Sequence, residues 1–275
     1  MTLQEKLKQC QQNKTAILAT NFYNFETLQA VLSAASDGNS PVLLQLTKSS
    51  IEYMGLEMAV SMARQGLTDY NLTGWIHLDH GNSIDLVQRC LDAGFDSVMI
   101  DSSEKPLEEN ISTTFKVVEL AKKYGAIVES ELGFIAKLGQ NQEGAYTTVE
   151  DASRFVSETG IDALAIAIGS AHGFYKSAPH LNITRLKEIH EKIPTILVLH
   201  GSSGIPHQMV QEAIRNGISK VNLATEIKDC FMSSLKYRVN NFDEIDLRKV
   251  FPVATQAVKN LLIEKYKMVS FANRN

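Results

Sequence analysis

The chain has 275 residues, 44% of them hydrophobic, and a formal net charge of −4, which together allow a large buried core and argue against a nucleic-acid surface. Its three cysteines, at positions 10, 90 and 230, are too few and too dispersed to predict a disulfide framework or a cysteine-based zinc site. No apolar run reaches the roughly 18 residues of a membrane helix, and the polar N-terminus does not resemble a signal peptide, so we expect a cytoplasmic protein with no membrane partner.

Short apolar runs recur along the chain and predict eight strands. They cover residues 16–20, 41–46, 74–79, 97–101, 126–132, 163–168, 195–200 and 220–225. Most of these runs are continuously apolar, which is typical of strands that are buried on both faces of a parallel sheet.

Amphipathic segments that separate these runs predict helices. Residues 3–12 predict an N-terminal helix and residues 248–265 a C-terminal one, and the segments 24–38, 83–94, 149–160 and 206–217 each end at a glycine, a common helix terminator. Eight strand-then-helix units predict an α/β fold, a single-domain (β/α)8 TIM barrel over residues 1–275 with extra terminal helices. A doubly wound open sheet is the alternative.

Three histidines follow predicted strands directly. They are His80, His172 and His200, and a glycine follows each one. Barrel enzymes build their sites from the C-terminal ends of the strands. Three neutral imidazoles suit Zn²⁺ and leave one coordination position open for a substrate. The pattern therefore predicts a catalytic zinc site, although any one of these histidines alone is more often a polar rim residue. We interpret His77, two residues before Asp79, as a buried structural histidine.

Carboxylates occupy the same predicted rim. Asp79 adjoins the proposed ligand His80, so it is placed to move a proton on a metal-bound substrate. Asp101 and Glu131 are candidates either for partners that orient the metal ligands or for an alternative metal position. The alternative for each carboxylate is a helix cap or an ion pair with a lysine.

Three segments could hold a phosphate. Residues 201–204, Gly-Ser-Ser-Gly, follow the seventh strand, residues 222–225 end the eighth strand and open a helix, and Gly173 with Lys176 follows the sixth. In barrels, phosphates are frequently held by the loops after strands seven and eight, near a helix N-terminus. The alternative is that these glycines only make turns.

Seven motifs, taken in order, resemble the class II, zinc-dependent ketose-bisphosphate aldolases, with the tagatose-bisphosphate aldolase branch closest. The motifs are HLDHG (77–81), SVMIDSS (97–103), ESELG (129–133), YTTVEDA (146–152), ALAIAIGSAHGFYK (163–176), LVLHGSSGIP (197–206) and KVNLATEIK (220–228). The resemblance spans nearly the whole chain. It implies reversible cleavage of a ketose 1,6-bisphosphate, of tagatose or fructose type, to dihydroxyacetone phosphate and glyceraldehyde 3-phosphate, a reaction of glycolytic carbohydrate metabolism.

The resemblance also implies roles for individual residues. It makes His80, His172 and His200 the zinc ligands and Asp79 the group that carries the proton of the C4 oxygen. A monovalent cation, Na⁺ or K⁺, accompanies the phosphate in this family. The substrate-binding positions that it implies, together with their neighbours in the same segments, are Asn21, Thr47, Gly173, Lys176, Gly201, Ser202, Ser203, Asn222, Ala224 and Thr225.

Two departures from the family pattern affect the predicted identity of the substrate and of the catalytic base. Residues 133–146 lack the family's Gly-Gly pair and offer one carboxylate, Glu143, as the candidate catalytic base at C3; a solvated loop glutamate is the alternative. Ala224 stands where fructose-bisphosphate enzymes often carry an aspartate, which favours the tagatose branch. A same-fold aldolase for another phosphorylated ketose, such as a deoxy or sulfonated sugar, and a non-catalytic partner subunit are the competing functions. We expect a homo-oligomer, a dimer or a tetramer.

Overall fold

Eight parallel strands close into a barrel in the computed structural model, which describes residues 1–133, 135, 146–175 and 178–270. The strands follow one another in chain order, and β1 pairs with β8 to close the sheet. They are β1 (Ile17–Asn21), β2 (Val42–Thr47), β3 (Gly74–Gly81), β4 (Ser97–Ile100), β5 (Ile127–Leu132), β6 (Ala163–Ile166), β7 (Ile196–Leu199) and β8 (Ile218–Leu223). The predicted (β/α)8 barrel is confirmed, and the open-sheet alternative is wrong.

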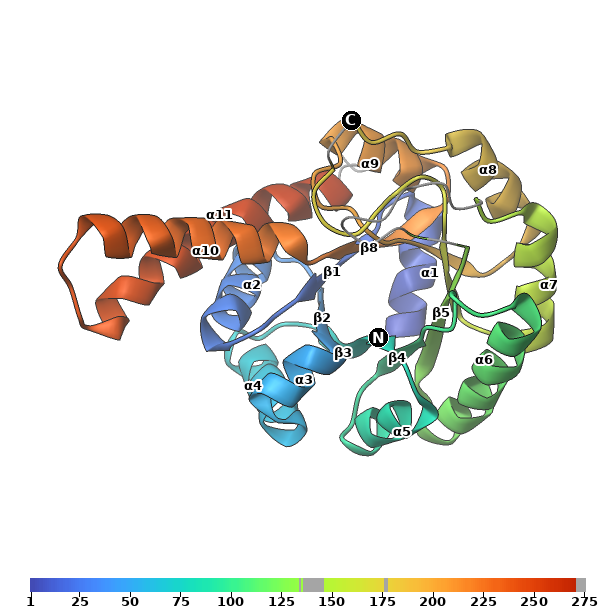
Figure 1. Ribbon diagram of the computed structural model, residues 1–275, viewed down its shortest axis with the longest axis horizontal. Helices are drawn as coiled ribbons and strands as arrows, with labels where there is room; N and C mark the ends of the chain where they lie inside the picture. The colour runs from blue at the N-terminus through green and yellow to red at the C-terminus, as the bar shows by residue number, and fades with distance from the viewer. Residues whose placement is uncertain (134, 136–145, 176–177, 271–275) are drawn as a thin grey trace.

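Helices surround the strands (Figure 1). The helices that precede α10 (Thr225–Asn241) along the chain are α1 (Leu3–Asn13), α2 (Phe25–Asp37), α3 (Lys48–Met54), α4 (Leu56–Asp69), α5 (Ile84–Asp92), α6 (Leu107–Ala121), the 3-10 turn η1 (Lys122–Tyr124), α7 (Val149–Thr159), α8 (Ile183–Lys192) and α9 (His207–Arg215). Asn24 and Ser83 cap α2 and α5 by accepting backbone N–H groups. Among the described residues, no helix is long and apolar enough to cross a membrane.

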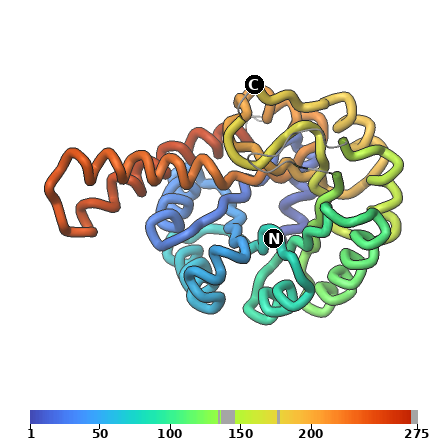
Figure 2. Tube along the Cα trace, in the orientation of Figure 1, coloured from blue at the N-terminus to red at the C-terminus, as the bar shows by residue number. Residues whose placement is uncertain are grey.

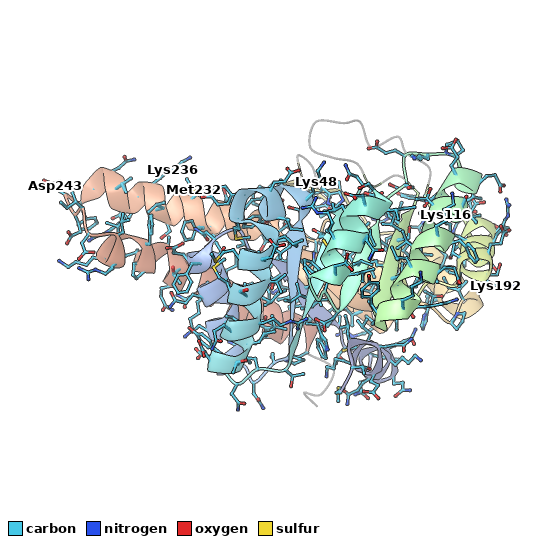
Figure 3. The ribbon with its side chains drawn as sticks, turned by 90° about the horizontal axis from the view of Figure 1, so that it is seen from below. Lys48, Lys116, Lys192, Met232, Lys236 and Asp243 are labelled. Atoms are coloured by element: carbon cyan, nitrogen blue, oxygen red, sulfur yellow. The ribbon has the colours of Figure 1, made fainter. Side chains whose placement is uncertain are left out.

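The last two helices, α10 (Thr225–Asn241) and α11 (Leu247–Val269), form a hairpin that we call the arm. The arm projects away from the barrel, and its chain path is clearest in the trace (Figure 2). Met232, Lys236 and Asp243 are spread along it toward its tip (Figure 3). The C-terminal helix is longer than the predicted 248–265, mainly at its C-terminal end, where α11 continues to Val269.

The apolar interior of the barrel is confined to its N-terminal half. Helix α1 closes this end, since Leu3, Leu7 and Cys10 pack against inward-facing residues such as Leu43 and Trp75. Nearer the C-terminal ends of the strands, the inward positions become polar and include Gln45, His77, Asp79, Glu129, Glu131, Lys220 and Asn222, all of which are buried. The fold thus places an enclosed polar layer directly beneath the rim where the site was predicted.

Candidate metal centre and anion site

His80, His172 and His200 meet at the C-terminal ends of the strands. Their ring centroids are 5.2 Å apart for His80 and His172, 5.0 Å for His80 and His200, and 5.8 Å for His172 and His200. With Glu131, each offers one donor atom to a set in which all atoms lie within 4.8 Å of one another. One metal ion can be reached from all four side chains.

An irregularity in β3 turns His80 into this cluster. Side chains alternate along a strand, so Asp79 and His80 should face opposite sides of the sheet. The pairing of β3 with β4 shifts register between Leu78 and Gly81, and His80 has a φ of +89°. Left-handed backbone at a residue other than glycine costs of order 1–3 kcal/mol and is typical of functional sites. The distortion lets two adjacent side chains serve one site.

Carboxylates hold two of the imidazoles in place. Asp101 Oδ2 lies 2.7 Å from His80 Nδ1, which leaves Nε2 of that ring directed to the cluster. His200 lies between Glu131, 2.9 Å from Nδ1, and Glu129, 2.9 Å from Nε2. Such carboxylate–histidine contacts orient metal ligands. Of the two alternatives for the acids, Asp101 takes the orienting position and Glu131 lies within the donor set.

The charges of the cluster favour a bound cation. Burial opposes protonation of His200, but Glu129 and Glu131 outweigh it and raise the pKa of His200 to about 10. Burial, together with His200 and His80, lowers the pKa of His172 to about 3, so that ring is neutral at physiological pH, as a metal ligand must be. A positive charge is therefore stabilised between the carboxylates, and a metal ion can supply it.

Asp79 lies beside the cluster as a buried, hydrogen-bonded carboxylate. Its oxygens accept hydrogen bonds from Asn21 Nδ2 at 2.9 Å and Asn222 Nδ2 at 3.3 Å, and Oδ1 lies 3.6 Å from His80 Nε2. Burial raises the pKa of Asp79, but His80 and His200 outweigh it and bring the pKa to about 2. The group is ionised at neutral pH, held at both oxygens, and within reach of anything that the cluster binds.

Two loops and a helix N-terminus converge next to these residues. Gly173 and Gly201 adopt φ values of +95° and +65°, and α10 begins at Thr225. Tyr175 links the loops, because its hydroxyl accepts a hydrogen bond from the Ala171 N–H and donates one to the Gly201 carbonyl, both at 2.8 Å. Exposed backbone N–H groups at such glycines and at a helix N-terminus are well suited to an anion.

The remaining predicted residues have varied surroundings. The Ser202 hydroxyl donates to the Asn222 carbonyl, and Ser203 Oγ accepts the Glu226 N–H at 3.3 Å, so both serines help to join the loop after β7 to the start of α10. Thr47 caps α3 by accepting the Ser50 N–H. Ala224 precedes α10 without a side-chain cap. Glu143 and Lys176 lie outside the described residues.

Three buried residues near the site had no role assigned from the sequence, although Glu129 was recognised as an acid at the end of the fifth strand. Glu129 contacts His200, Lys220 Nζ lies 2.7 Å from Glu129 Oε2, and Gln45 Nε2 donates to Asn21 Oδ1 at 3.2 Å. One signal was available, because Glu129 and Glu131 are two positions apart on one strand and must face the same side. Lys220 was a second signal, because it lies two positions before Asn222 on one strand and must face the same side.

A cavity of about 420 Å³ opens beside the histidines. His80 and His172 line one side, and Asp101, Ser102 and Lys105 from the loop after β4 line the other. A cavity of about 650 Å³ at the opposite end of the barrel, near Trp75 and α1, contains none of the clustered histidines. The cavity at the C-terminal end therefore has access to the candidate metal centre.

Comparison with known proteins agrees with this geometry. A family model described as "Fructose-bisphosphate aldolase class-II" matches residues 1–274. The fructose-bisphosphate aldolase of Helicobacter pylori (strain J99 / ATCC 700824) is 36% identical over 287 residues, covering 93% of each chain. The crystal structure of the YdjI aldolase from Escherichia coli K12 superposes with a TM-score of 0.89 at 30% identity, over 98% of this chain and 97% of that one. The fructose-bisphosphate aldolase of Campylobacter jejuni, at 22% identity and a TM-score of 0.85 over 99% and 95% of the two chains, shares the fold.

Proposed function

The chain belongs to the class II fructose-bisphosphate aldolases, a family of lyases, and on that premise we propose that it is a zinc-dependent enzyme for a ketose 1,6-bisphosphate. The substrate is of tagatose or fructose type, and the products are dihydroxyacetone phosphate and glyceraldehyde 3-phosphate. The observation that carries this proposal is the convergence of three imidazoles and Glu131 beside the ionised Asp79. We assign the reaction to glycolytic carbohydrate metabolism in the cytoplasm.

His80, His172 and His200 would hold the zinc ion, with Glu131 in reach and Asp101 orienting His80. The donor set fits, because catalytic zinc takes three protein ligands and keeps a position for substrate. Bound there, zinc would supply Lewis-acid polarisation of the carbonyl and hydroxyl oxygens of the substrate.

Asp79 would carry the proton of the C4 oxygen when the C3–C4 bond breaks or forms. The amide groups of Asn21 and Asn222 fix its carboxylate, so its oxygens do not have to be ordered when substrate binds. Its burial excludes competing water. Positioned acid–base groups of this kind contribute on the order of 10² to 10⁴ in rate.

The phosphate of the dihydroxyacetone phosphate half would bind where the loops after β6 and β7 meet the N-terminus of α10. Gly173, Gly201, Ser203 and Thr225 would contribute backbone and hydroxyl groups, with Lys176 as a cation. We place the accompanying Na⁺ or K⁺ in the same region. Asn21, Thr47, Ser202, Asn222 and Ala224 complete the proposed substrate-binding set.

The base that removes the C3 proton is assigned to Glu143. The support is chemical, because Glu143 is the one carboxylate between residues 134 and 145 and the segment follows β5, whose end carries Glu131. Glu131 is the alternative candidate for this base, since it lies within the donor set of the cluster.

A screen of ketose phosphates for release of dihydroxyacetone phosphate tests the proposal. Tagatose and fructose 1,6-bisphosphate differ only in configuration at C4, so the ratio of their kcat/KM values reports how the C4 oxygen is aligned with Asp79. Preference for tagatose 1,6-bisphosphate is expected, and activity should disappear with a chelator and return with zinc. Activity that survives removal of the metal would refute the zinc assignment.

A second candidate function is cleavage of another phosphorylated ketose, such as a deoxy or sulfonated sugar. The departure of residues 133–146 from the family pattern favours it, because this segment lacks the Gly-Gly pair and offers one carboxylate, Glu143. Higher kcat/KM for such a sugar in the same screen would establish this alternative. Zinc binding without turnover of any ketose phosphate would instead identify a non-catalytic partner subunit.

We also propose that the chain forms a homo-oligomer, a dimer or a tetramer, through the arm. Apolar side chains near its tip are exposed, with Tyr237 at 66%, Ile245 at 92% and Leu247 at 61% of their full area. Clustered exposed apolar residues are typical of association sites. Light scattering after size exclusion should give a dimer or tetramer mass that Ile245→Lys lowers; a monomeric wild-type chain would contradict the proposal.

A further inference from the structure

A lysine is sealed inside the barrel below the histidine cluster. Lys220 points inward from β8, only 1% exposed, and its Nζ lies 2.7 Å from Glu129 Oε2 on the opposite strand β5. Glu129 is likewise 1% exposed. His77 Nε2 lies 3.4 Å from the same Nζ, and its Nδ1 is 2.8 Å from Ser97 Oγ. Lys220 and Glu129 thus form an ion pair without contact with water.

Stability does not account for this pair. Taking two charges out of water is expensive, and apolar side chains of similar size are often as stabilising or more so. The adjacent layer of this barrel shows that apolar filling is possible, since Leu43, Trp75 and Ile127 occupy it. A charged pair in the next layer calls for a reason other than packing.

Glu129 connects the lysine to a proposed metal ligand. One carboxylate oxygen contacts Lys220, and the other lies 2.9 Å from His200 Nε2. The second nitrogen of that imidazole, Nδ1, lies 2.9 Å from Glu131, which belongs to the donor set. When Glu129 accepts the Nε2–H, the lone pair of Nδ1 is the one left for the metal.

The second oriented histidine shows the same three-part arrangement. Asp101 contacts His80 Nδ1 through Oδ2, and its Oδ1 is anchored by the Ser103 hydroxyl at 2.7 Å and the Ser103 N–H at 3.1 Å. In both cases a carboxylate holds the ring with one oxygen and is itself held through the other. For Glu129, which lies deeper in the barrel, the anchor is Lys220.

We propose that Lys220 is a positioning residue of the metal centre, which holds Glu129 so that Glu129 sets the orientation and the tautomer of His200. The inference rests on the proposed zinc site. His77 cannot replace the lysine, because its Nδ1 is already engaged with Ser97 and its Nε2 lies 3.9 Å from Glu129 Oε2. Lys220 itself touches neither substrate nor metal.

The test compares zinc affinity in Lys220→Met and a matched control. Lys265→Met removes the lysine of another largely buried ion pair, in which Lys265 Nζ lies 2.6 Å from Glu226 Oε2. The two side chains are 6% and 13% exposed, and they belong to α11 and α10, outside the barrel interior. Zinc dissociation constants come from competition with a chromophoric chelator on the full chain. Loss of an orienting partner of a metal ligand lowers affinity about 10- to 100-fold, so we expect that loss in Lys220→Met and a change within about 2-fold in Lys265→Met.

The visible absorption spectrum of the Co²⁺-substituted protein distinguishes a positioning role of Lys220 from a nonspecific loss of structure. With Co²⁺ in place of zinc, the visible absorption reports the ligand geometry, so Lys220→Met should shift these bands and Lys265→Met should not. Wild-type affinity and an unchanged cobalt spectrum in Lys220→Met would overturn the inference, as would equal losses in both variants. If Lys220→Met does not fold, Glu129→Gln/Lys220→Met removes both buried charges and should fold; wild-type zinc affinity in it would also overturn the inference. A wild-type chain that binds no zinc refutes the proposed function and the inference together.

Discussion

Replacing Gly201 by alanine should damage the site through the backbone alone. Gly201 has a φ of +65°, and a Cβ at this position would lie 2.3 Å from the Ala171 carbonyl oxygen and 2.5 Å from its carbon. Ordinary van der Waals contact begins near 3.4 Å, so the Ala171 peptide would have to retreat by about 1 Å. Ala171 directly precedes His172, and the displacement therefore moves a proposed metal ligand.

Gly160→Ala is the matched control. Gly160 ends α7 with a φ of +69°, and a Cβ there meets nothing within 4 Å. Both variants carry the cost of a left-handed alanine, about 1–2 kcal/mol, which corresponds to a fall in Tm of roughly 2–8 °C for a chain of this size. Only Gly201→Ala adds the steric conflict.

The expected difference lies in activity. A misplacement of about 1 Å in a catalytic centre can cost on the order of 10²-fold in rate, so kcat/KM for dihydroxyacetone phosphate release should fall by about that factor in Gly201→Ala. Gly160→Ala should retain activity within about 2-fold at a temperature well below its Tm. Steady-state kinetics and thermal unfolding of the two variants measure both effects. Comparable kcat/KM values in the two alanine variants would refute the steric reasoning.

Three further predictions concern the proposed catalytic residues. His80→Ala, His172→Ala and His200→Ala should each lose tight zinc and turnover together, and full zinc occupancy by elemental analysis in all three would contradict the ligand assignment. Asp79→Asn should keep its zinc and lose about 10²- to 10⁴-fold in kcat, because the amide cannot exchange a proton; turnover within a few-fold of wild type would reduce Asp79 to an orienting role. Glu143→Gln should slow exchange of the dihydroxyacetone phosphate C3 proton with solvent by about 10² or more at unchanged zinc content, whereas exchange at the wild-type rate would move the base to another group.

The sequence was sufficient for the barrel because its signals are local. Continuous apolar runs identify strands that are buried on both faces, and terminating glycines mark where helices end. Right-handed β/α connections then leave few arrangements for eight such units. The same reasoning placed His80, His172 and His200 on one rim, since every strand of a parallel barrel ends on the same side.

The strand-end positions were predicted more easily than the directions of their side chains. Simple alternation would send Asp79 and His80 to opposite faces of β3, so the sequence alone could not explain how both serve one site. The answer is the left-handed His80 and the shifted register between Leu78 and Gly81. This distortion belongs to the pairing of β3 with β4, so it cannot be read from the sequence of either strand alone.

The sequence by itself therefore determined the fold class, the rim and the residue types gathered on it. Only the tertiary structure decided which carboxylate contacts which imidazole nitrogen. Asp101 contacts Nδ1 of His80, whereas Glu131 and Glu129 contact Nδ1 and Nε2 of His200, and Lys220 pairs with Glu129. The physical reason is that hydrogen bonds and ion pairs depend on distances of a few ångströms. Glu129 and Lys220 are 91 residues apart in the chain, and closure of the barrel brings their charged atoms to 2.7 Å.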